Sequence, residues 1–209
     1  SFPTRRSSDL NAGAHPFTIR DSTVGTDRCN SGGTAIGTGN FTAERVYVRG
    51  FGDAIRAGAP NVTVRDSLLK MCTNDPSTHA DGIQDYPGSA NVVFDHNTVD
   101  LCGGRVPSDG HCDLKSGYNA PIFVASKLTK GARITNNLVM GGVYSLYTIP
   151  YAGAWTVSGN RVVKGTWTYG PAHTEGNCGL IAQWSDNSIV TIDASYRITS
   201  TVGPLGCPA

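Results

Sequence analysis

Side chains that can carry out acid–base chemistry gather in two inserted segments, residues 73–80 and 103–120. The tripeptide His-Ala-Asp that begins at His79 is echoed by His-Cys-Asp beginning at His111. An imidazole can accept a proton at neutral pH, and a carboxylate can hold a proton or a cation. The candidate site residues are Arg56, His79, Asp81, Gln84, Asp85, His111, Asp113, Lys115, Tyr118 and Tyr147.

These side chains suit the cleavage of a uronic-acid polymer by β-elimination. The reaction needs a group that neutralises the substrate carboxylate, a base for the C5 proton and an acid for the leaving oxygen. We expect Arg56 and Gln84, near neighbours on successive strands, to bind and neutralise the carboxylate. The candidate bases are His79, His111 and Lys115, and the candidate acids are Tyr147 and Tyr118, of which Tyr118 is also a substrate-binding candidate.

The same aspartates allow other interpretations. Asp81, Asp85 and Asp113 are candidate ligands of Ca²⁺, so the expected cofactor is either none or calcium. A hydrolase would need only two or three carboxylates at the right separation. Asp81 also matches Asp53 in register and can cap a turn as an ordinary repeat residue. The two histidines of the tripeptides can simply anchor their loops, and His96, at a predicted corner, is expected to be structural.

A repeated eight-residue pattern must position these side chains. Its copies begin at Phe17, Phe41, Val62, Val92, Ala132 and Trp155, with a base spacing in the low twenties and two longer units. The first, third and eighth positions are mostly apolar. The sixth positions are Ser22, Val46, Ser67, Asn97, Asn137 and Asn160, which predicts a stacked internal ladder of amides. A preceding strand recurs around Ile36, Ile55, Ile83, Phe123 and Leu146.

Repeats of this length predict an all-β fold, a right-handed single-stranded parallel β-helix (solenoid) of about six to eight coils. Each unit alone has too little apolar surface to pack, and stacking at about 4.8 Å buries it. Both insertions enter at the same corner of adjacent coils, which is typical of a binding face. Residues 166–187 are expected to form a loop rich in aromatic side chains.

The first ten residues, 1–10, match no unit and read as translated sequencing-adapter read-through. We therefore expect one parallel β-helix domain over 11–209, truncated at its N-terminus. Among six cysteines, Cys72 and Cys102 share one register in adjacent units, which predicts a disulfide and an oxidising compartment. The cysteine spacings fit no zinc finger.

Composition excludes several partners. The net charge is +1 over 209 residues, so the molecule as a whole does not attract nucleic acid or a membrane surface. No apolar run approaches the roughly 18 residues of a membrane span.

The chain resembles secreted, mostly bacterial right-handed parallel β-helix proteins of the pectate-lyase-like superfamily. The resemblance lies in the repeats Val-Thr-Val-Arg-Asp-Ser and Phe-Asp-His-Asn-Thr-Val, in the strand His79 to Gln84 and in the segment Cys112 to Tyr118. The resemblance covers roughly 15–200. It implies a secreted, monomeric protein that acts on an acidic polysaccharide, with a polysaccharide lyase as the favoured activity. The Arg-centred signature of pectate lyases and the Tyr-Gly-Phe-Asp-Pro-His motif of mannuronan epimerases are absent. The alternatives are a non-catalytic polysaccharide-binding or adhesin-type β-helix, a glycoside hydrolase or a uronate epimerase.

Overall fold

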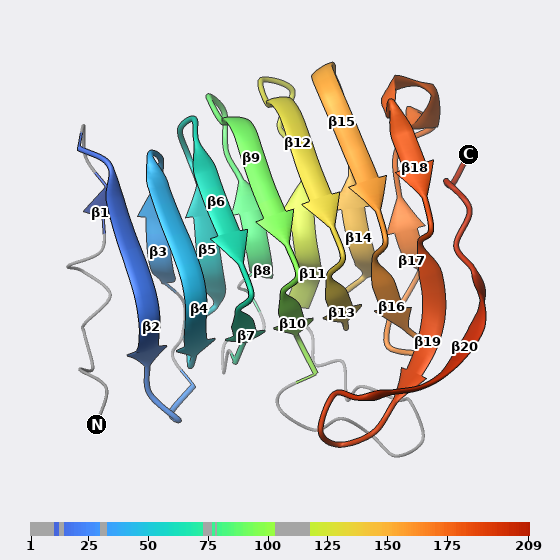
Figure 1. Cartoon of the computed structure of the whole chain (residues 1–209), viewed down its shortest axis with the longest axis horizontal. Coiled ribbons are helices and arrows are strands. Elements are labelled where there is room, and N and C mark those ends of the chain that lie inside the picture. The colour runs from blue at the N-terminus through green and yellow to red at the C-terminus, as the bar shows by residue number, and fades with distance from the viewer. Residues whose placement is uncertain (1–10, 13–14, 30–32, 73–76, 78, 103–117) are drawn as a thin grey trace.

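The strands form two sheets that run along the length of the molecule (Figure 1). The computed structural model describes the chain outside residues 1–10, 13–14, 30–32, 73–76, 78 and 103–117. In that part the regular structure is strand except for a 3-10 helix, η2 (Cys178–Leu180). The predicted 1–10 boundary and three site candidates, His111, Asp113 and Lys115, lie outside the described residues.

The first sheet has seven strands, each contributed by a successive stretch of the chain. They are β1 (Asn11–Ala12), β3 (Thr34–Thr38), β5 (Asp53–Ala57), β8 (Ala80–Asp85), β11 (Tyr118–Val124), β14 (Tyr144–Thr148) and β17 (Gly170–His173), in that spatial order. All neighbours in this sheet pair in parallel. The order in space follows the order in sequence, as expected when each unit stacks on the one before it.

The second sheet has thirteen strands in two arms that share β4. One arm contains β2 (Phe17–Gly25), β4 (Phe41–Arg49), β6 (Val62–Arg65), β9 (Ala90–Asp95), β12 (Lys130–Thr135), β15 (Ala152–Ser158) and β18 (Gln183–Ser185). The other contains β7 (Leu68–Lys70), β10 (Thr98–Asp100), β13 (Leu138–Met140), β16 (Arg161–Val163), β19 (Ser188–Ile192) and the antiparallel β20 (Ile198–Pro204). This all-β, mostly parallel arrangement is consistent with a β-helix.

The predicted register of the repeat is confirmed. Phe17 pairs with Phe41 and Phe41 with Val62, while Ala132 pairs with both Val92 and Trp155. The pairing of Thr63 with Val93 joins the copies that begin at Phe17, Phe41 and Val62 to those that begin at Val92, Ala132 and Trp155. A seventh copy, which the sequence did not reveal, follows in β18, where Gln183 pairs with Thr156. The expected aromatic-rich loop at 166–187 therefore contains strand structure in β17 and β18.

In every copy of the repeat, a residue with a left-handed backbone conformation separates the two arms of the sheet. The fifth positions are Asp21, Arg45, Asp66, His96, Asn136, Gly159 and Asp186, with φ between 49° and 68°. This backbone conformation is rare for most residues and turns the chain sharply. The bend lets the sixth side chain point into the interior, where Asn97, Asn137 and Asn160 are buried.

The amide ladder is confirmed and is longer than predicted. Each asparagine donates from Nδ2 to the Oδ1 of the next, over 3.0 Å from Asn97 to Asn137, 2.9 Å from Asn137 to Asn160 and 2.9 Å from Asn160 to Asn187. Ser67 extends the line, because its backbone N–H donates to Asn97 Oδ1. Apolar side chains form the hydrophobic core, in which Ile55, Ile83 and the large Trp155 are fully buried.

Two predictions need correction. Ile122, not Phe123, occupies the inward position of β11, because Ile122 pairs with Ile83 and Leu146. A register irregularity between Tyr118 and Ala120 shifts the strand, and a shift of one residue moves a side chain to the other face.

The predicted Cys72–Cys102 disulfide is also wrong. Cys72 is bonded to Cys29, which follows β2 two units earlier, with a Cα–Cα distance of 4.9 Å, and Cys102 is disulfide-bonded to another cysteine. A shared register places two cysteines near each other but does not exclude a partner from a loop, and Cys29 lies in the segment between β2 and β3. A second bond joins Cys178 to Cys207.

Candidate functional site

Five side chains form a line across the outer face of the seven-stranded sheet. They are Arg56 (β5), Gln84 (β8), Phe123 (β11), Tyr147 (β14) and His173 (β17), each paired in register with the next. All five are half-buried. We call them the outer row. Because neighbouring strands lie about 4.8 Å apart, the row extends over ~19 Å. A line of this length matches a linear polymer better than a compact small molecule.

A cavity of about 370 Å³ lies at the polar end of the outer row. Its lining includes three predicted site residues, His79, Arg56 and Gln84, together with Tyr86 and Asp53. His79 is exposed and directly precedes β8, whereas Arg56 and Gln84 extend from neighbouring strands. The predicted proximity of Arg56 and Gln84 is confirmed, and the structure adds His79 to the same cavity.

The position of the Arg56 guanidinium is set by two neighbours. Its Nη2 lies 2.7 Å from Asp53 Oδ2, and its Cζ lies 4.6 Å from the centroid of the Tyr86 ring. The Nε atom is buried and has no hydrogen-bond partner among the described residues. The guanidinium is thus held in place while 41% of the Arg56 side chain stays exposed, so that a carboxylate can approach it from solvent.

Asp81 is fully buried and belongs to the repeat. Asp53 Oδ1 accepts a hydrogen bond from the Asp81 backbone N–H over 3.0 Å, and Asp81 Oδ1 accepts one from the Ala120 N–H over 2.9 Å. Each aspartate therefore caps the backbone of the following unit, as the shared register suggested. Burial, and then the neighbouring Asp53 carboxylate, raise the pKa of Asp81 well above its ordinary value.

Replacing Asp81 with asparagine is expected to stabilise the protein at neutral pH. Because its pKa is raised, Asp81 releases its proton at a higher pH in the folded state than in the unfolded state, so the wild type loses stability as the pH rises above about 4. Asparagine keeps an oxygen for the Ala120 N–H and does not titrate. Thermal unfolding should therefore show a higher melting temperature for Asp81→Asn at pH 7 and a smaller difference near pH 4. An equal difference at both pH values would contradict a buried, proton-binding Asp81.

Asp85 also has a structural role. Its carboxylate accepts hydrogen bonds from the backbone N–H groups of Ala125 and Ser126, over 2.8 Å and 3.1 Å, and from the Thr129 hydroxyl. Burial raises the pKa of Asp85, and these hydrogen bonds act in the opposite direction. No group of three or more His, Cys, Asp or Glu side chains within the described residues could hold a metal ion. Since Asp113 lies outside that part of the chain, the calcium site stays a prediction.

The other end of the outer row is aromatic. The Phe123 and Tyr147 ring centroids lie 4.8 Å apart, as do those of Tyr147 and His173. Tyr144 stacks on His173 at 4.6 Å, and the 73% exposed Tyr169 lies 5.8 Å from Tyr144. Sequence reasoning did not select Phe123, Tyr144, Tyr169 or His173. Their common face could have been found only from the correct register of β11, β14 and β17.

Tyr147 and Tyr118 have different environments. Tyr147 lies on the outer face, two strand spacings from Gln84, and burial followed by the charge of Glu175 raises its pKa. Tyr118 is buried at 9% exposure and packs in the hydrophobic core, which does not suit a residue that must contact a substrate.

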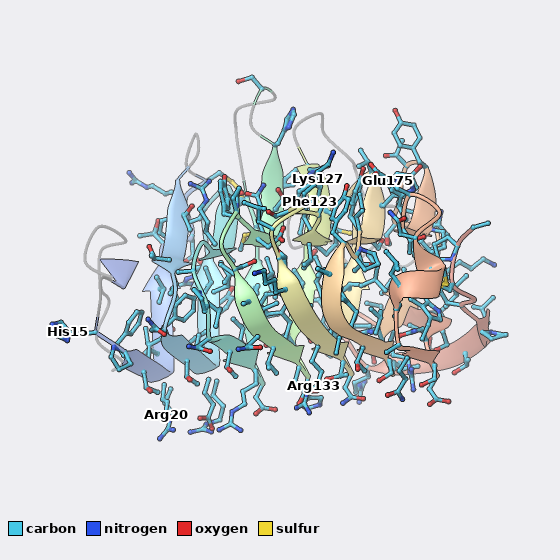
Figure 2. The ribbon with its side chains drawn as sticks, turned by 90° about the horizontal axis from the view of Figure 1, so that it is seen from above. His15, Arg20, Phe123, Lys127, Arg133 and Glu175 are labelled. Carbon is cyan, nitrogen blue, oxygen red and sulfur yellow. A yellow bond between two sulfur atoms is a disulfide. The ribbon has the colours of Figure 1, made fainter. Side chains whose placement is uncertain are left out.

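Figure 2 shows Phe123, Lys127 and Glu175 on one side of the molecule, opposite Arg20 and Arg133 of the larger sheet.

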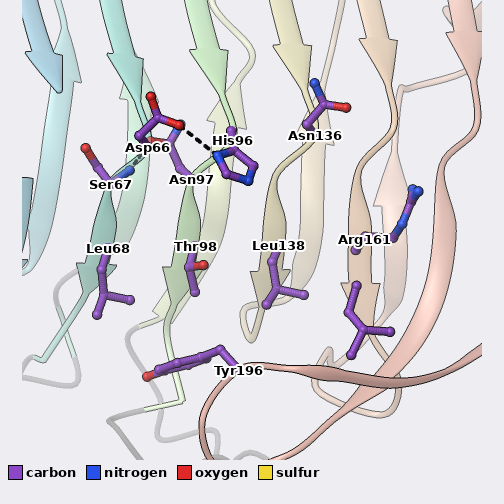
Figure 3. Close-up of a pocket in the computed structure, with 11 residues that line it drawn as sticks. Asp66, Ser67, Leu68, His96, Asn97, Thr98, Asn136, Leu138, Arg161 and Tyr196 are labelled. Carbon is purple, nitrogen blue, oxygen red and sulfur yellow. Dashed lines mark hydrogen bonds and ion pairs between the residues drawn. The ribbon is translucent and has the colours of Figure 1, made fainter. Parts of the chain in front are cut away.

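His96 lies away from the outer row, beside a second cavity of about 410 Å³ (Figure 3). Its Nδ1 lies 2.7 Å from Asp66 Oδ1, the residue at the same position of the preceding unit. The cavity is also lined by Arg161 and by Tyr196 from the turn before β20. The contact joins two corner residues, in agreement with the structural role expected for His96.

No protein-family model, curated protein or solved structure matches this chain. Within the described residues, no helix is long and apolar enough to cross a membrane.

Proposed function

We propose that the protein is a polysaccharide lyase that binds an acidic polymer along the outer row and cleaves it by β-elimination at the polar cavity. The observation that carries the proposal is that His79, Arg56 and Gln84 line one cavity. These residues supply a base, a fixed cation and an amide donor, which are the groups that the reaction uses. The proposal includes a closed, right-handed β-helix as the scaffold.

The proposed reaction begins with a uronate carboxylate bound by Arg56 and Gln84, which stabilise the charge that develops on it. His79 removes the C5 proton. The electron pair of the C5–H bond forms a C4–C5 double bond, while the C4–O bond breaks and its oxygen takes up a proton. Tyr86 lines the same cavity and has a hydroxyl that can donate this proton, whereas Tyr147 lies two strands beyond Gln84. The products are a new reducing end and an unsaturated uronate.

Non-catalytic binding of the polysaccharide is the second candidate. It is favoured by the ion pair between Arg56 and Asp53, which lowers the net charge at the cavity, and by the aromatic end of the row. Hydrolysis has less support, because Asp53 is the only carboxylate among the described residues that line the cavity and it already binds Arg56.

We also propose that the protein is secreted. The disulfides Cys29–Cys72 and Cys178–Cys207, together with the disulfide of Cys102, support this location because such bonds persist mainly in oxidising compartments.

A panel of uronate polymers tests the proposed function. We expect at least one polymer to release products with the ultraviolet absorbance of an unsaturated uronate when it is incubated with the full chain. The same polymers cast into native gels report binding, because a bound protein migrates more slowly. Retardation without an unsaturated product would favour the binding module over the lyase. If no acidic polymer is cleaved and none retards the protein, both candidate functions are refuted.

A further inference from the structure

The aromatic end of the outer row forms a continuous surface that the proposed reaction does not use. We call the five residues Phe123, Tyr144, Tyr147, Tyr169 and His173 the aromatic patch. They come from β11, β14 and β17 and from the segment just before β17. The centroids of neighbouring rings lie between 4.6 Å and 5.8 Å apart, so the rings make one contiguous area. Each ring has an apolar face, and the three tyrosines and His173 also carry polar atoms at their edges.

The electrostatic character of the aromatic patch differs from that of the polar cavity. Glu175 follows β17, and its Oε2 accepts a hydrogen bond from the Tyr151 hydroxyl over 3.4 Å. Lys127 is also near Tyr151, with its Nζ 5.8 Å from the ring centroid. Burial raises the pKa of Tyr147, and the negative charge of Glu175 is the next largest cause of that rise. A negative group would therefore be repelled at the aromatic patch, whereas Arg56 attracts one at the cavity.

We infer that the aromatic patch binds an uncharged pyranose residue of the same polymer whose uronate occupies the polar cavity, so that the substrate is a heteropolysaccharide with neutral sugars between its uronates. This inference rests on the proposed function, because it takes the outer row as the path of the polymer. It assigns the substrate class and places a second binding site on the row.

The spacing of the strands supports this assignment. Tyr147 lies two strands beyond Gln84, which is about 10 Å and close to the length of two pyranose residues in an extended chain. The C–H face of a pyranose packs well on aromatic rings, and the phenol and imidazole edges can bond its hydroxyl groups. A polymer made of uronates alone would place a carboxylate near Glu175, which is unfavourable.

Affinity gels with two probes test the inference. One probe is polygalacturonate, in which every sugar is a uronate, and the other is gellan oligosaccharide, in which neutral sugars separate the uronates. The proteins carry His79→Ala, so the probes stay intact during the measurement. We expect gellan oligosaccharide to bind about tenfold more tightly than polygalacturonate. Tyr147→Leu should remove most of this preference, because leucine retains apolar contact without a flat ring or a hydroxyl.

The isosteric replacement Glu175→Gln tests the electrostatic part of the inference directly. Glu175 is exposed, so its replacement leaves the core unchanged, and we expect binding of polygalacturonate to improve by about fivefold while gellan binding changes little. The matched control is Tyr47→Leu, which removes a half-buried tyrosine from the other sheet and should change neither affinity. Circular dichroism spectra and melting curves of each variant establish that it is folded.

The outcomes separate the inference from the proposed function. If both probes bind equally and neither Tyr147→Leu nor Glu175→Gln changes the ratio, the inference is wrong while polysaccharide binding stands. If polygalacturonate binds more tightly than gellan oligosaccharide, the inference is wrong as well. If neither probe retards the folded protein, the proposed path of the polymer along the outer row is wrong, and the inference fails with it.

Discussion

Replacing His79 with alanine is expected to lower the turnover of a cleaved uronate polymer by about a hundredfold or more, the effect of losing a general base. His79 is the only imidazole among the described residues that line the polar cavity, and it lies beside Arg56 and Gln84. Its side chain is exposed, so the substitution should not disturb folding. The initial rate of formation of the unsaturated uronate measures the effect.

His96→Ala is the matched control for this experiment. His96 is likewise exposed, but it contacts Asp66 at the second cavity and is not part of the outer row. Its replacement should leave turnover unchanged. Gel retardation measured in parallel should show that His79→Ala still binds the polymer, because Arg56 and Gln84 are intact. Full turnover by the His79 variant on a substrate that the wild type cleaves would exclude His79 as the base.

The sequence contains enough information for the scaffold because one strong period runs through it. Apolar residues at fixed positions of each unit placed Phe17, Phe41 and Val62 in one register, and the sixth positions predicted the amide ladder. The unit that begins at Ala182 keeps the pattern, with Trp184 at the third position and Asn187 at the sixth, but it was missed because residues 166–187 were expected to form a loop. A period defines which residues stack, and stacking then defines most of the core.

The candidate site could be predicted only in part, because it depends on residues that the period does not constrain. Arg56 and Gln84 were correctly placed side by side, since both occupy the outward position after a buried isoleucine. Phe123 was predicted as the counterpart of Ile83 at the centre of its strand, because the long insertion before β11 hides the register. Its pairing with Gln84 places it on the outer face instead. Cys29 lies outside the repeated pattern, so no register argument could connect it with Cys72.

The amide ladder shows how a polar feature specifies this fold. Asn137 Oδ1 accepts hydrogen bonds from both the backbone N–H and the Nδ2 of Asn97, each over 3.0 Å. Its Nδ2 donates to the Phe94 carbonyl and to Asn160 Oδ1, each over 2.9 Å. These groups are buried, and water cannot replace a lost partner in a well-packed interior. A unit that slipped in register would leave several of them unpaired.

Replacing Asn137 with alanine is therefore expected to lower the free energy of unfolding by roughly 3–5 kcal/mol, because two or three buried polar groups lose a partner at about 1–3 kcal/mol each. The matched control is Asn136→Gly at the adjacent, exposed position. Asn136 has φ 57°, a conformation that glycine adopts readily, and Gly159 already occupies this position in the next unit. The control should change stability by less than about 1 kcal/mol.

Chemical denaturation followed by circular dichroism, with the disulfides intact, measures both variants. Because Asn97 and Asn137 share their hydrogen bonds, the double variant Asn97→Ala/Asn137→Ala should lose less stability than the sum of the two single variants. Strict additivity would show that the two amides act independently. A loss below about 1 kcal/mol for Asn137→Ala would show that the interior can satisfy the released groups, and the ladder would then not be what holds the units in register.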